Sequence, residues 1–190
     1  PCAVATAFGI GCGSGGDASI KQKLRAVLSC GKPAVIDADG LNNLDNELKK
    51  LLSLRHVLTP HPGEMARLTG KPIEDVLRDP AGFAENTAKA FGCIVLLKGA
   101  VSVAAHPDGR LRYNASGNPG LAKGGSGDVL TGIITALLAQ GLEPFDAASA
   151  GAYILGSSAE SALELLHERA LTAGDVLDAI EKTAGITEHR

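Results

Sequence analysis

The feature that most constrains this chain is a glycine-rich turn that leads directly into a helical segment. Glycines at 124, 125 and 127 precede Asp128 and an apolar stretch with helical spacing. Glycine reaches backbone angles that other residues rarely adopt, so the turn can direct several N–H groups toward one point, where the helix dipole adds positive potential. The turn matches neither a P-loop nor the dinucleotide fingerprint. It therefore predicts an anion site of another kind at the start of a helix.

Asp128 stands where this turn meets the helix. A carboxylate there is stabilised by the helix dipole and repelled by a bound phosphate, and it can accept the proton of a hydroxyl that attacks phosphorus. We therefore expect Asp128 to act as a base. A simple helix cap is the alternative, because aspartate is a common N-cap residue.

Short apolar runs alternate with helical segments along the chain. The predicted strands are Pro33–Ala38, His56–Leu58 and Cys93–Lys98, then a hairpin of Val101–Ala105 and Arg110–Tyr113. The predicted helices are Leu41–Leu52, Gly63–Leu68, Pro72–Phe91, Asp128–Gln140, Pro144–Arg169 and Thr172–Thr183. This alternation predicts an α/β fold, with a largely parallel central sheet flanked by helices and a small antiparallel hairpin. At 190 residues, a single domain over 1–190 is expected.

Composition excludes several classes of function. The net charge of −3 and the absence of any block of five like charges argue against a nucleic-acid partner. The longest apolar stretch, Gly132–Ala139, is far shorter than a membrane span, and no basic leader is present, so a cytoplasmic protein is expected. The four cysteines form no Cys-x-x-Cys pair, which favours free thiols over a zinc site or a disulfide scaffold.

Two predicted strands end in loops that could contact a ligand, since ligands bind at the carboxyl ends of strands in open α/β sheets. Lys98-Gly99-Ala100 ends the third strand, and its alternative is an ordinary turn into the hairpin. Asp37 and Asp39 end the first, where paired carboxylates could order Mg²⁺ through water. The alternative for this acidic pair is a helix cap.

Two further segments carry weaker signals. His61 lies between two prolines, so a stiff extended backbone can present its imidazole to a ligand at little entropic cost. Residues 9–16 form a second glycine loop, which fits a phosphate or ribose contact and fits a flexible turn equally well.

Four segments together resemble the NAD(P)H-hydrate dehydratase family, in order and in spacing. They are VIDADGLN at 35–42, LTPHPGE at 58–64, LLKGAVS at 96–102 and NPGLAKGGSGDVLTG at 118–132. The resemblance implies a ribokinase-like fold, with ADP or ATP as co-substrate, Mg²⁺ as cofactor and an NAD(P)H hydrate as substrate. It also implies phosphoryl transfer to the hydroxyl of the hydrated ring, followed by elimination of phosphate.

The resemblance also implies a role for each matching residue. Gly11, His61 and Asp128 would contact the hydrate, with Asp128 as the base. The nucleotide would be contacted by Lys98, Gly99, Ala100, Val101 and Ser102, and by Asn118, Pro119, Gly120, Leu121, Ala122, Lys123, Gly124, Gly125, Ser126 and Gly127.

The chain departs from the family pattern in two places. Family members carry further sequence, including strands of the sheet, before the glycine loop that here begins at Gly9, so the domain is expected to be N-terminally incomplete. This loop reads GIGCG where the family shows a proline and a leucine, and Lys123 replaces a small residue. An unpaired sheet edge and the apolar C-terminal helices also favour a homo-oligomer.

Two alternative functions stay open at this stage. One is a ribokinase-like kinase of a small vitamin-precursor alcohol, which shares a glycine-rich loop ending in aspartate. The other is an inactive nucleotide-binding remnant, favoured by the abrupt start at Pro1.

Overall fold

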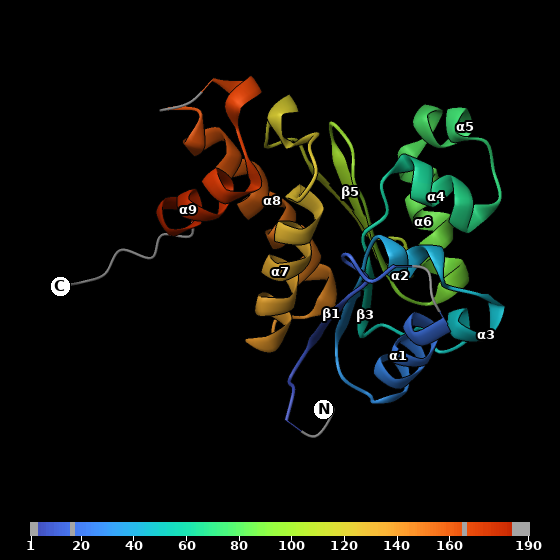
Figure 1. Ribbon diagram of the computed structural model, residues 1–190. Helices are drawn as coiled ribbons and strands as arrows, with labels where there is room; N and C mark the ends of the chain where they lie inside the picture. The colour runs from blue at the N-terminus through green and yellow to red at the C-terminus, as the bar shows by residue number, and fades with distance from the viewer. Residues whose placement is uncertain (1–3, 16–17, 165–166, 184–190) are drawn as a thin grey trace.

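The computed structural model describes residues 4–15, 18–164 and 167–183, and the strands in these ranges form one sheet in the order β1 to β6 (Figure 1). The strands are β1 (Phe8–Ile10), β2 (Ala34–Ile36), β3 (His56–Leu58), β4 (Ile94–Leu97), β5 (Ser102–Ala105) and β6 (Leu111–Asn114). Strands β1 to β4 run parallel, and β5 and β6 form an antiparallel hairpin against β4. The predicted fold class, including the hairpin, is confirmed.

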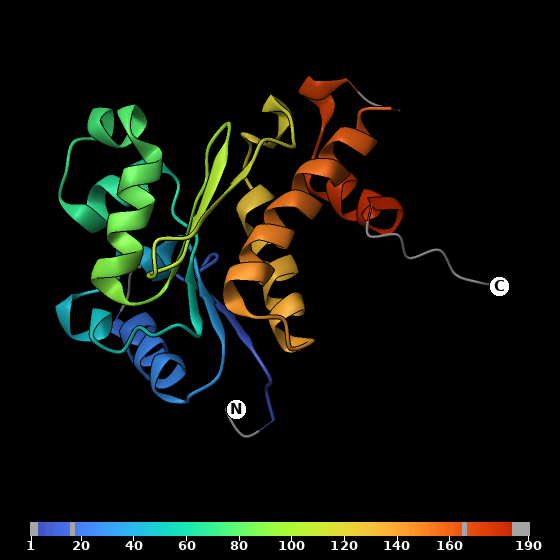
Figure 2. The same cartoon turned by 180° about the vertical axis from the view of Figure 1, so that it is seen from behind.

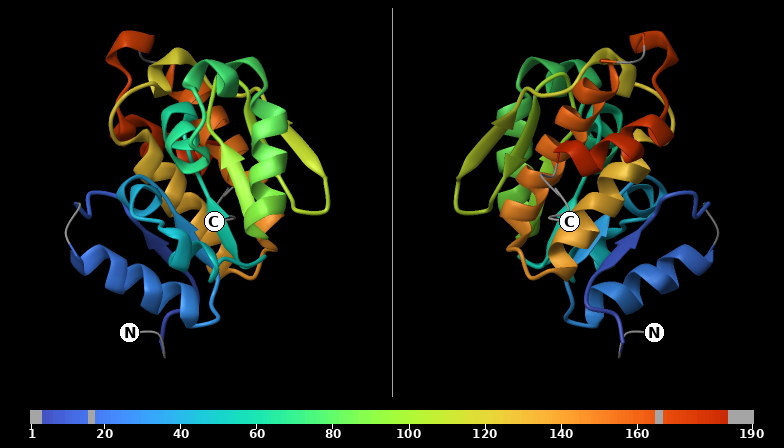
Figure 3. Two further views of the ribbon diagram at one scale, coloured as in Figure 1. Left: turned by 90° about the vertical axis from the view of Figure 1, so that its right-hand side faces the viewer. Right: turned by 90° about the vertical axis from the view of Figure 1, so that its left-hand side faces the viewer.

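Helices cover both faces of the sheet, as Figures 1 and 2 show. One layer holds α1 (Ala18–Ser29), α2 (Asp39–Asn42), α3 (Asn46–Lys49), α4 (Pro62–Thr69), α5 (Ile73–Arg78) and α6 (Pro80–Phe91). The other holds α7 (Ser126–Ala139), α8 (Pro144–Ala162) and α9 (Ala173–Thr183), with the short 3-10 turns η1 (Pro119–Leu121) and η2 (Glu168–Ala170) nearby. In Figure 3, β1 lies toward one edge of the sheet and the hairpin of β5 and β6 toward the other.

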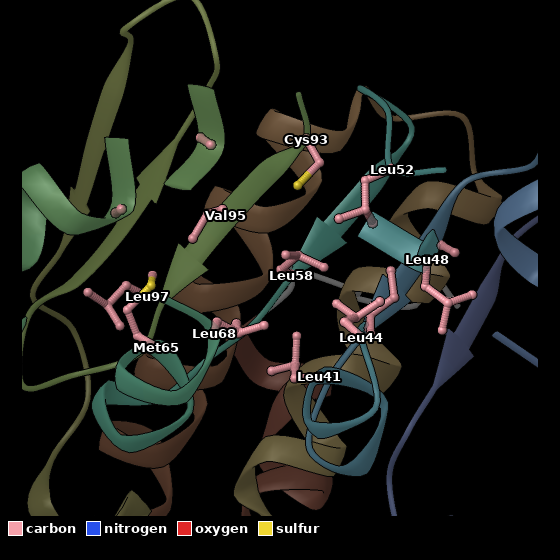
Figure 4. Packing of buried hydrophobic residues seen from close by; sticks show 14 of the residues in the cluster. Leu41, Leu44, Leu48, Leu52, Leu58, Met65, Leu68, Cys93, Val95 and Leu97 are labelled. Carbon is pink, nitrogen blue, oxygen red and sulfur yellow. The ribbon is translucent and has the colours of Figure 1, made fainter. Parts of the chain in front are cut away.

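The sheet separates two apolar cores. Successive side chains of a strand point to opposite faces, and in β4 Val95 and Leu97 pack into one core whereas Ile94 and Leu96 pack into the other. Figure 4 shows the first core, where leucines of the α2 to α4 region meet β3 and β4. Burial on both faces explains why these strands are continuous apolar runs without alternation.

Three predicted helices are shorter or divided. In place of the helix predicted over Leu41–Leu52 the structure has α2, which begins earlier at Asp39, and α3, because Asp45 caps α3 by accepting a hydrogen bond from the Leu48 N–H at 3.0 Å. Pro72–Phe91 divides at Asp79, which caps α6 ahead of Pro80. The third, Pro144–Arg169, ends as α8 at Ala162.

The sequence prediction omitted one helix. Ile20, Leu24, Val27 and Leu28 of α1 are buried, and their spacing is helical, so the sequence does carry a signal for this helix. Within the described ranges, none of the helices has the length and apolarity that crossing a bilayer requires. Cys12, Cys30 and Cys93 are free thiols as expected, and Cys2 lies outside the described residues.

A buried histidine in β3 makes the stability of the fold depend on pH. His56 is 1% exposed, its Nδ1 accepts a hydrogen bond from the Ser53 N–H at 3.0 Å, and its Nε2 has no partner. Burial, together with the positive charge of Arg55, lowers the pKa of His56 from 6.5 to about 4. We expect the free energy of unfolding to fall by up to about 3 kcal/mol as the pH drops from 6.5 to about 4, because the unfolded chain then binds a proton that the folded chain does not.

Urea unfolding at pH 8, 6 and 5 measures this dependence. The variant His56→Phe is the matched control, since it fills the site without a titrating group and should lose this part of the pH dependence. An identical slope of stability against pH in both proteins would contradict the assignment.

Candidate functional site

Four loops meet at one edge of the sheet, because β1 to β4 are parallel and each ends there. The residues that follow these strands are Gly11 after β1, Asp37 after β2, His61 after β3 and Lys98 after β4. These are residues that the sequence analysis selected. The topology therefore brings segments separated by almost ninety residues to a common edge, as open α/β sheets do at their ligand sites.

Gly11 packs against the turn that follows β2. A Cβ on Gly11 would lie 1.9 Å from the Asp37 carbonyl oxygen and 2.7 Å from the Gly40 nitrogen, and its φ is +119°. Glycine is thus required by contact and by conformation. Ala38, within the facing turn, has a φ of 47°, a conformation that costs a residue with a Cβ about 1–3 kcal/mol. The tight packing of the two turns places the backbone that carries Asp37.

The Asp37 carboxylate is buried and links three elements. It is 2% exposed, and its Oδ1 accepts a hydrogen bond from Lys98 Nζ at 2.7 Å. Its Oδ2 accepts one from Thr131 Oγ1 of α7 at 3.2 Å. A Cβ on Gly127 would lie 3.2 Å from the same Oδ2 and 3.6 Å from Lys98 Nζ. The ion pair therefore packs directly against the first turn of α7.

His61 and Glu64 continue this network on the side of α4. The His61 Nδ1 accepts the Gly63 N–H at 3.0 Å, and the Glu64 carboxylate accepts the His61 N–H at 2.8 Å, which completes a capping box. Glu64 Oε2 also lies 3.8 Å from Lys98 Nζ. His61 keeps a half-exposed side chain, so the histidine both caps α4 and faces solvent at the site edge.

The glycine turn opens α7 without a side-chain cap. Gly125, with a φ of +94°, is the N-cap residue, and within the described residues the first turn has no side-chain cap. Asp128 lies in this turn with an exposed side chain. The cap alternative for Asp128 therefore finds no support in the geometry, and the N–H groups of the turn are free to bind an anion.

A cavity of about 540 Å³ lies beside Asp128, lined by the loop after β1 and one face of α7. Cys12 contributes to its wall together with Thr131. Burial, opposed by a hydrogen bond with Thr131 and reinforced by the neighbouring Asp128 carboxylate, raises the pKa of the Cys12 thiol from 9.0 to about 11. The thiol is therefore protonated at neutral pH and can donate to the Asp128 carboxylate.

The two segments expected to contact a nucleotide lie differently. Lys98 reaches the first turn of α7, whereas Gly99, Ala100 and Val101 are exposed in the turn to β5, which Ser102 begins. In the 118–127 segment the Asn118 Oδ1 accepts the Gly120 N–H at 3.0 Å, and its buried Nδ2 has no partner.

Lys123 makes two hydrogen bonds within the protein. Its Nζ donates to the carbonyl oxygens of Arg169 at 2.6 Å and Leu171 at 2.9 Å, so it ties the glycine-rich segment to the η2 region. Contact between Lys123 and a nucleotide stays a prediction.

Protein hydrogen bonds occupy three of the four carboxylate oxygens of the acidic pair after β2. Both oxygens of Asp37 have protein partners, and the Asp39 Oδ2 accepts the Gly15 N–H at 2.8 Å. Across the described part of the chain, no three His, Cys, Asp or Glu side chains converge as metal ligands do. A magnesium contact of these two carboxylates through water stays a prediction. Gly16 of the first glycine loop lies outside the described residues.

Three residues at the site were not selected from the sequence. Thr131 lies three residues after Asp128, so helical spacing alone places both on one face of α7. Glu64 has no local sequence signal for this place, because its proximity to Lys98 depends on tertiary structure. Cys12 was noted as a departure in the loop, but its closeness to Asp128 has no local sequence signal.

Comparison with known proteins gives one family. A sequence family described as NAD(P)H-hydrate dehydratase matches residues 2–182. The chain is 41% identical over 180 residues to the ADP-dependent (S)-NAD(P)H-hydrate dehydratase of Neisseria meningitidis, covering 91% of this chain and 61% of that protein. The match to another curated relative covers 28% of that protein's length. The chain thus corresponds to part of the length of these relatives.

Solved structures agree with this result. The Bacillus subtilis ADP/ATP-dependent NAD(P)H-hydrate dehydratase, co-crystallised with ATP and Mg²⁺, superposes with a TM-score of 0.84 at 31% identity, covering 95% of this chain and 64% of that one. A ribokinase-like superfamily protein of Enterococcus faecalis superposes with a TM-score of 0.77 at 26% identity, covering 98% of this chain and 66% of that one. The fold is therefore ribokinase-like.

Proposed function

The chain belongs to the NAD(P)H-hydrate dehydratase family, and we propose that it restores NADH or NADPH from the (S)-hydrate while a phosphoryl group is lost from ADP or ATP. One observation supports this most strongly. The exposed Asp128 lies beside a cavity of about 540 Å³ and directly follows a turn whose N–H groups lack a side-chain cap. A base and an anion site are thus adjacent, as phosphoryl transfer to a hydroxyl requires.

The proposed reaction has two stages. The terminal phosphoryl group passes from the nucleotide to the hydroxyl of the hydrated ring, and Asp128 accepts the hydroxyl proton. The phosphate then leaves with the electron pair of its C–O bond, assisted by the lone pair of the ring nitrogen. Loss of a proton from the adjacent carbon restores the ring double bond. The elements of water thus leave the ring within inorganic phosphate and as protons.

The site residues divide between the two substrates in this proposal. Gly11, His61 and Asp128 line the hydrate site, while 98–102 and 118–127 contact the nucleotide. Gly11 and Asp128 line the same cavity, and the Lys98 ammonium lies against Gly127 of the glycine turn. Both placements support the proposed division.

Magnesium fits this proposal as a companion of the nucleotide. The nucleotide phosphates would supply the inner ligands of the ion. Asp39 would contact the ion through a water molecule, since this ion usually retains several waters. When bound, the ion neutralises charge on the transferred phosphoryl group.

The test is incubation of the protein with the (S)-hydrate of NADH and either ADP or ATP. We expect the absorbance of the reduced nicotinamide to return, with one phosphate released per hydrate consumed. A kinase of a vitamin-precursor alcohol would leave the hydrate untouched and phosphorylate such an alcohol. Adenine nucleotide binding without hydrate repair would select the inactive remnant.

Replacement of His61 separates its two roles. We expect His61→Ala to raise the KM for the hydrate about tenfold, with a smaller change in the KM for the nucleotide, and to cost about 1 kcal/mol of stability through loss of the α4 cap. Steady-state kinetics with each substrate varied in turn measures the first effect.

His61→Asn is the matched control, because asparagine can cap α4 but lacks the imidazole. If the imidazole contacts the hydrate, His61→Asn raises the KM for the hydrate as much as His61→Ala does. Its stability, however, returns to that of the wild-type protein. A KM for the hydrate that returns to the wild-type value in His61→Asn would leave His61 as a helix cap alone.

We further propose a cytoplasmic homo-oligomer. Tyr153 and Leu177 of the C-terminal helices are 58% and 53% exposed, and apolar surface of this kind favours association. Sedimentation equilibrium tests this, and a monomer at micromolar concentration would contradict it.

A further inference from the structure

The Lys98 ammonium, beside the glycine turn, lies near two carboxylates, those of Asp37 and Glu64. Lys98 Nζ lies 2.7 Å from Asp37 Oδ1 and 3.8 Å from Glu64 Oε2, and the side chains of both acids are at least nine-tenths buried. Asp37 approaches from β2 and Glu64 from α4, so the position of the ammonium depends on which acid binds it more closely. In this structure Asp37 holds it against the first turn of α7.

Asp37 is held by contacts of its side chain and of its backbone. Its Oδ2 accepts the Thr131 hydroxyl, its carbonyl oxygen packs against Gly11, and its N–H donates to the Ile10 carbonyl oxygen at 3.1 Å. A lysine side chain has several rotatable bonds and a compact charge, so its ammonium has no fixed place without such a partner. Asp37 supplies this partner from a rigid strand end.

We propose that Asp37 is a positioning residue, whose carboxylate holds the Lys98 ammonium below the glycine turn of α7 for contact with the nucleotide phosphates. This rests on the proposed function in one respect, the binding of adenine nucleotide at that turn. Removal of the Asp37 charge lets the ammonium move toward Glu64, away from α7, so the bound phosphates lose a cation at the required place.

The test is a double-mutant cycle on ADP affinity, measured by titration without any hydrate. We expect Asp37→Asn to weaken ADP binding about tenfold. In a Lys98→Met background the same change should weaken it less than about twofold, because the residue acts through the lysine. Equal weakening in both backgrounds would show that Asp37 acts independently of Lys98 and would overturn the proposal.

Asp37→Glu gives a second arm that retains the buried ion pair if Asp37→Asn does not fold. It keeps the charge but moves the carboxylate by one methylene, so a positioning role predicts a loss of ADP affinity of at least about fivefold. Wild-type affinity in this variant would overturn the proposal. The ADP titration contains no hydrate, so its result does not depend on the repair reaction. A protein that binds ADP in this manner yet repairs no hydrate would refute the proposed function and leave this inference standing.

Discussion

Asp128→Ala is expected to lower kcat for hydrate repair by about 10²- to 10⁴-fold while the affinity for ADP changes by no more than a few fold. A base acts mainly in the transition state, so its removal affects turnover far more than ground-state binding. The exposed carboxylate has no capping role in α7, and its loss should therefore cost little stability. Single-turnover kinetics and an ADP titration measure the two effects separately.

Asp128→Asn is the matched control for this change. It keeps the size and polarity of the side chain and removes its basicity, so kcat should fall about as far as in Asp128→Ala. If both variants lose ADP affinity and kcat in equal proportion, the carboxylate has a structural role and the assignment as base is wrong.

The second large effect is expected at Gly11. Gly11→Ala should lower the free energy of unfolding by about 4 kcal/mol, as the sum of backbone strain and overpacking. The new Cβ would lie 1.9 Å from the Asp37 carbonyl oxygen, and backbone atoms cannot move aside as a flexible side chain can. Denaturant unfolding gives the change in free energy, and a fall in the midpoint without a change in slope indicates a loss of stability.

Gly13→Ala is the control within the same loop. Gly13 also has a positive φ, of +60°, but nothing lies within 4 Å of a Cβ built there. We expect this variant to lose only about 1 kcal/mol, which is the cost of the conformation. Similar losses in Gly11→Ala and Gly13→Ala would show that the contact with the β2 turn is not what requires glycine at position 11.

The sequence carries most of the fold because its signals are local. Asp79-Pro80 and Asp45 divide two predicted helices, because Asp79 and Asp45 each cap a new helix. The prediction followed the apolar spacing, which continues across both capping residues. β3 has the predicted bounds, since a buried strand between turn residues leaves little freedom. The helix α1 was missed although its four buried residues have helical spacing.

The site is only partly readable from sequence, because its key contacts join distant segments. Asp37 and Lys98 were each selected for a ligand role, yet their hydrogen bond spans 61 residues and depends on the pairing of β2, β3 and β4. Similarly, Lys123 was assigned to a nucleotide, and its bonds to carbonyl oxygens of the η2 region follow from tertiary packing. Motifs thus identify the residues, and the sheet decides how they combine.

Isotope transfer shows whether the glycine turn and Asp128 direct a phosphoryl group to the substrate hydroxyl. The hydrate of NADH is labelled with ¹⁸O in its hydroxyl and converted in unlabelled water with ADP. We expect one ¹⁸O atom in each inorganic phosphate released, because the C–O bond breaks after phosphoryl transfer. Unlabelled phosphate, with ¹⁸O released as water, would contradict it.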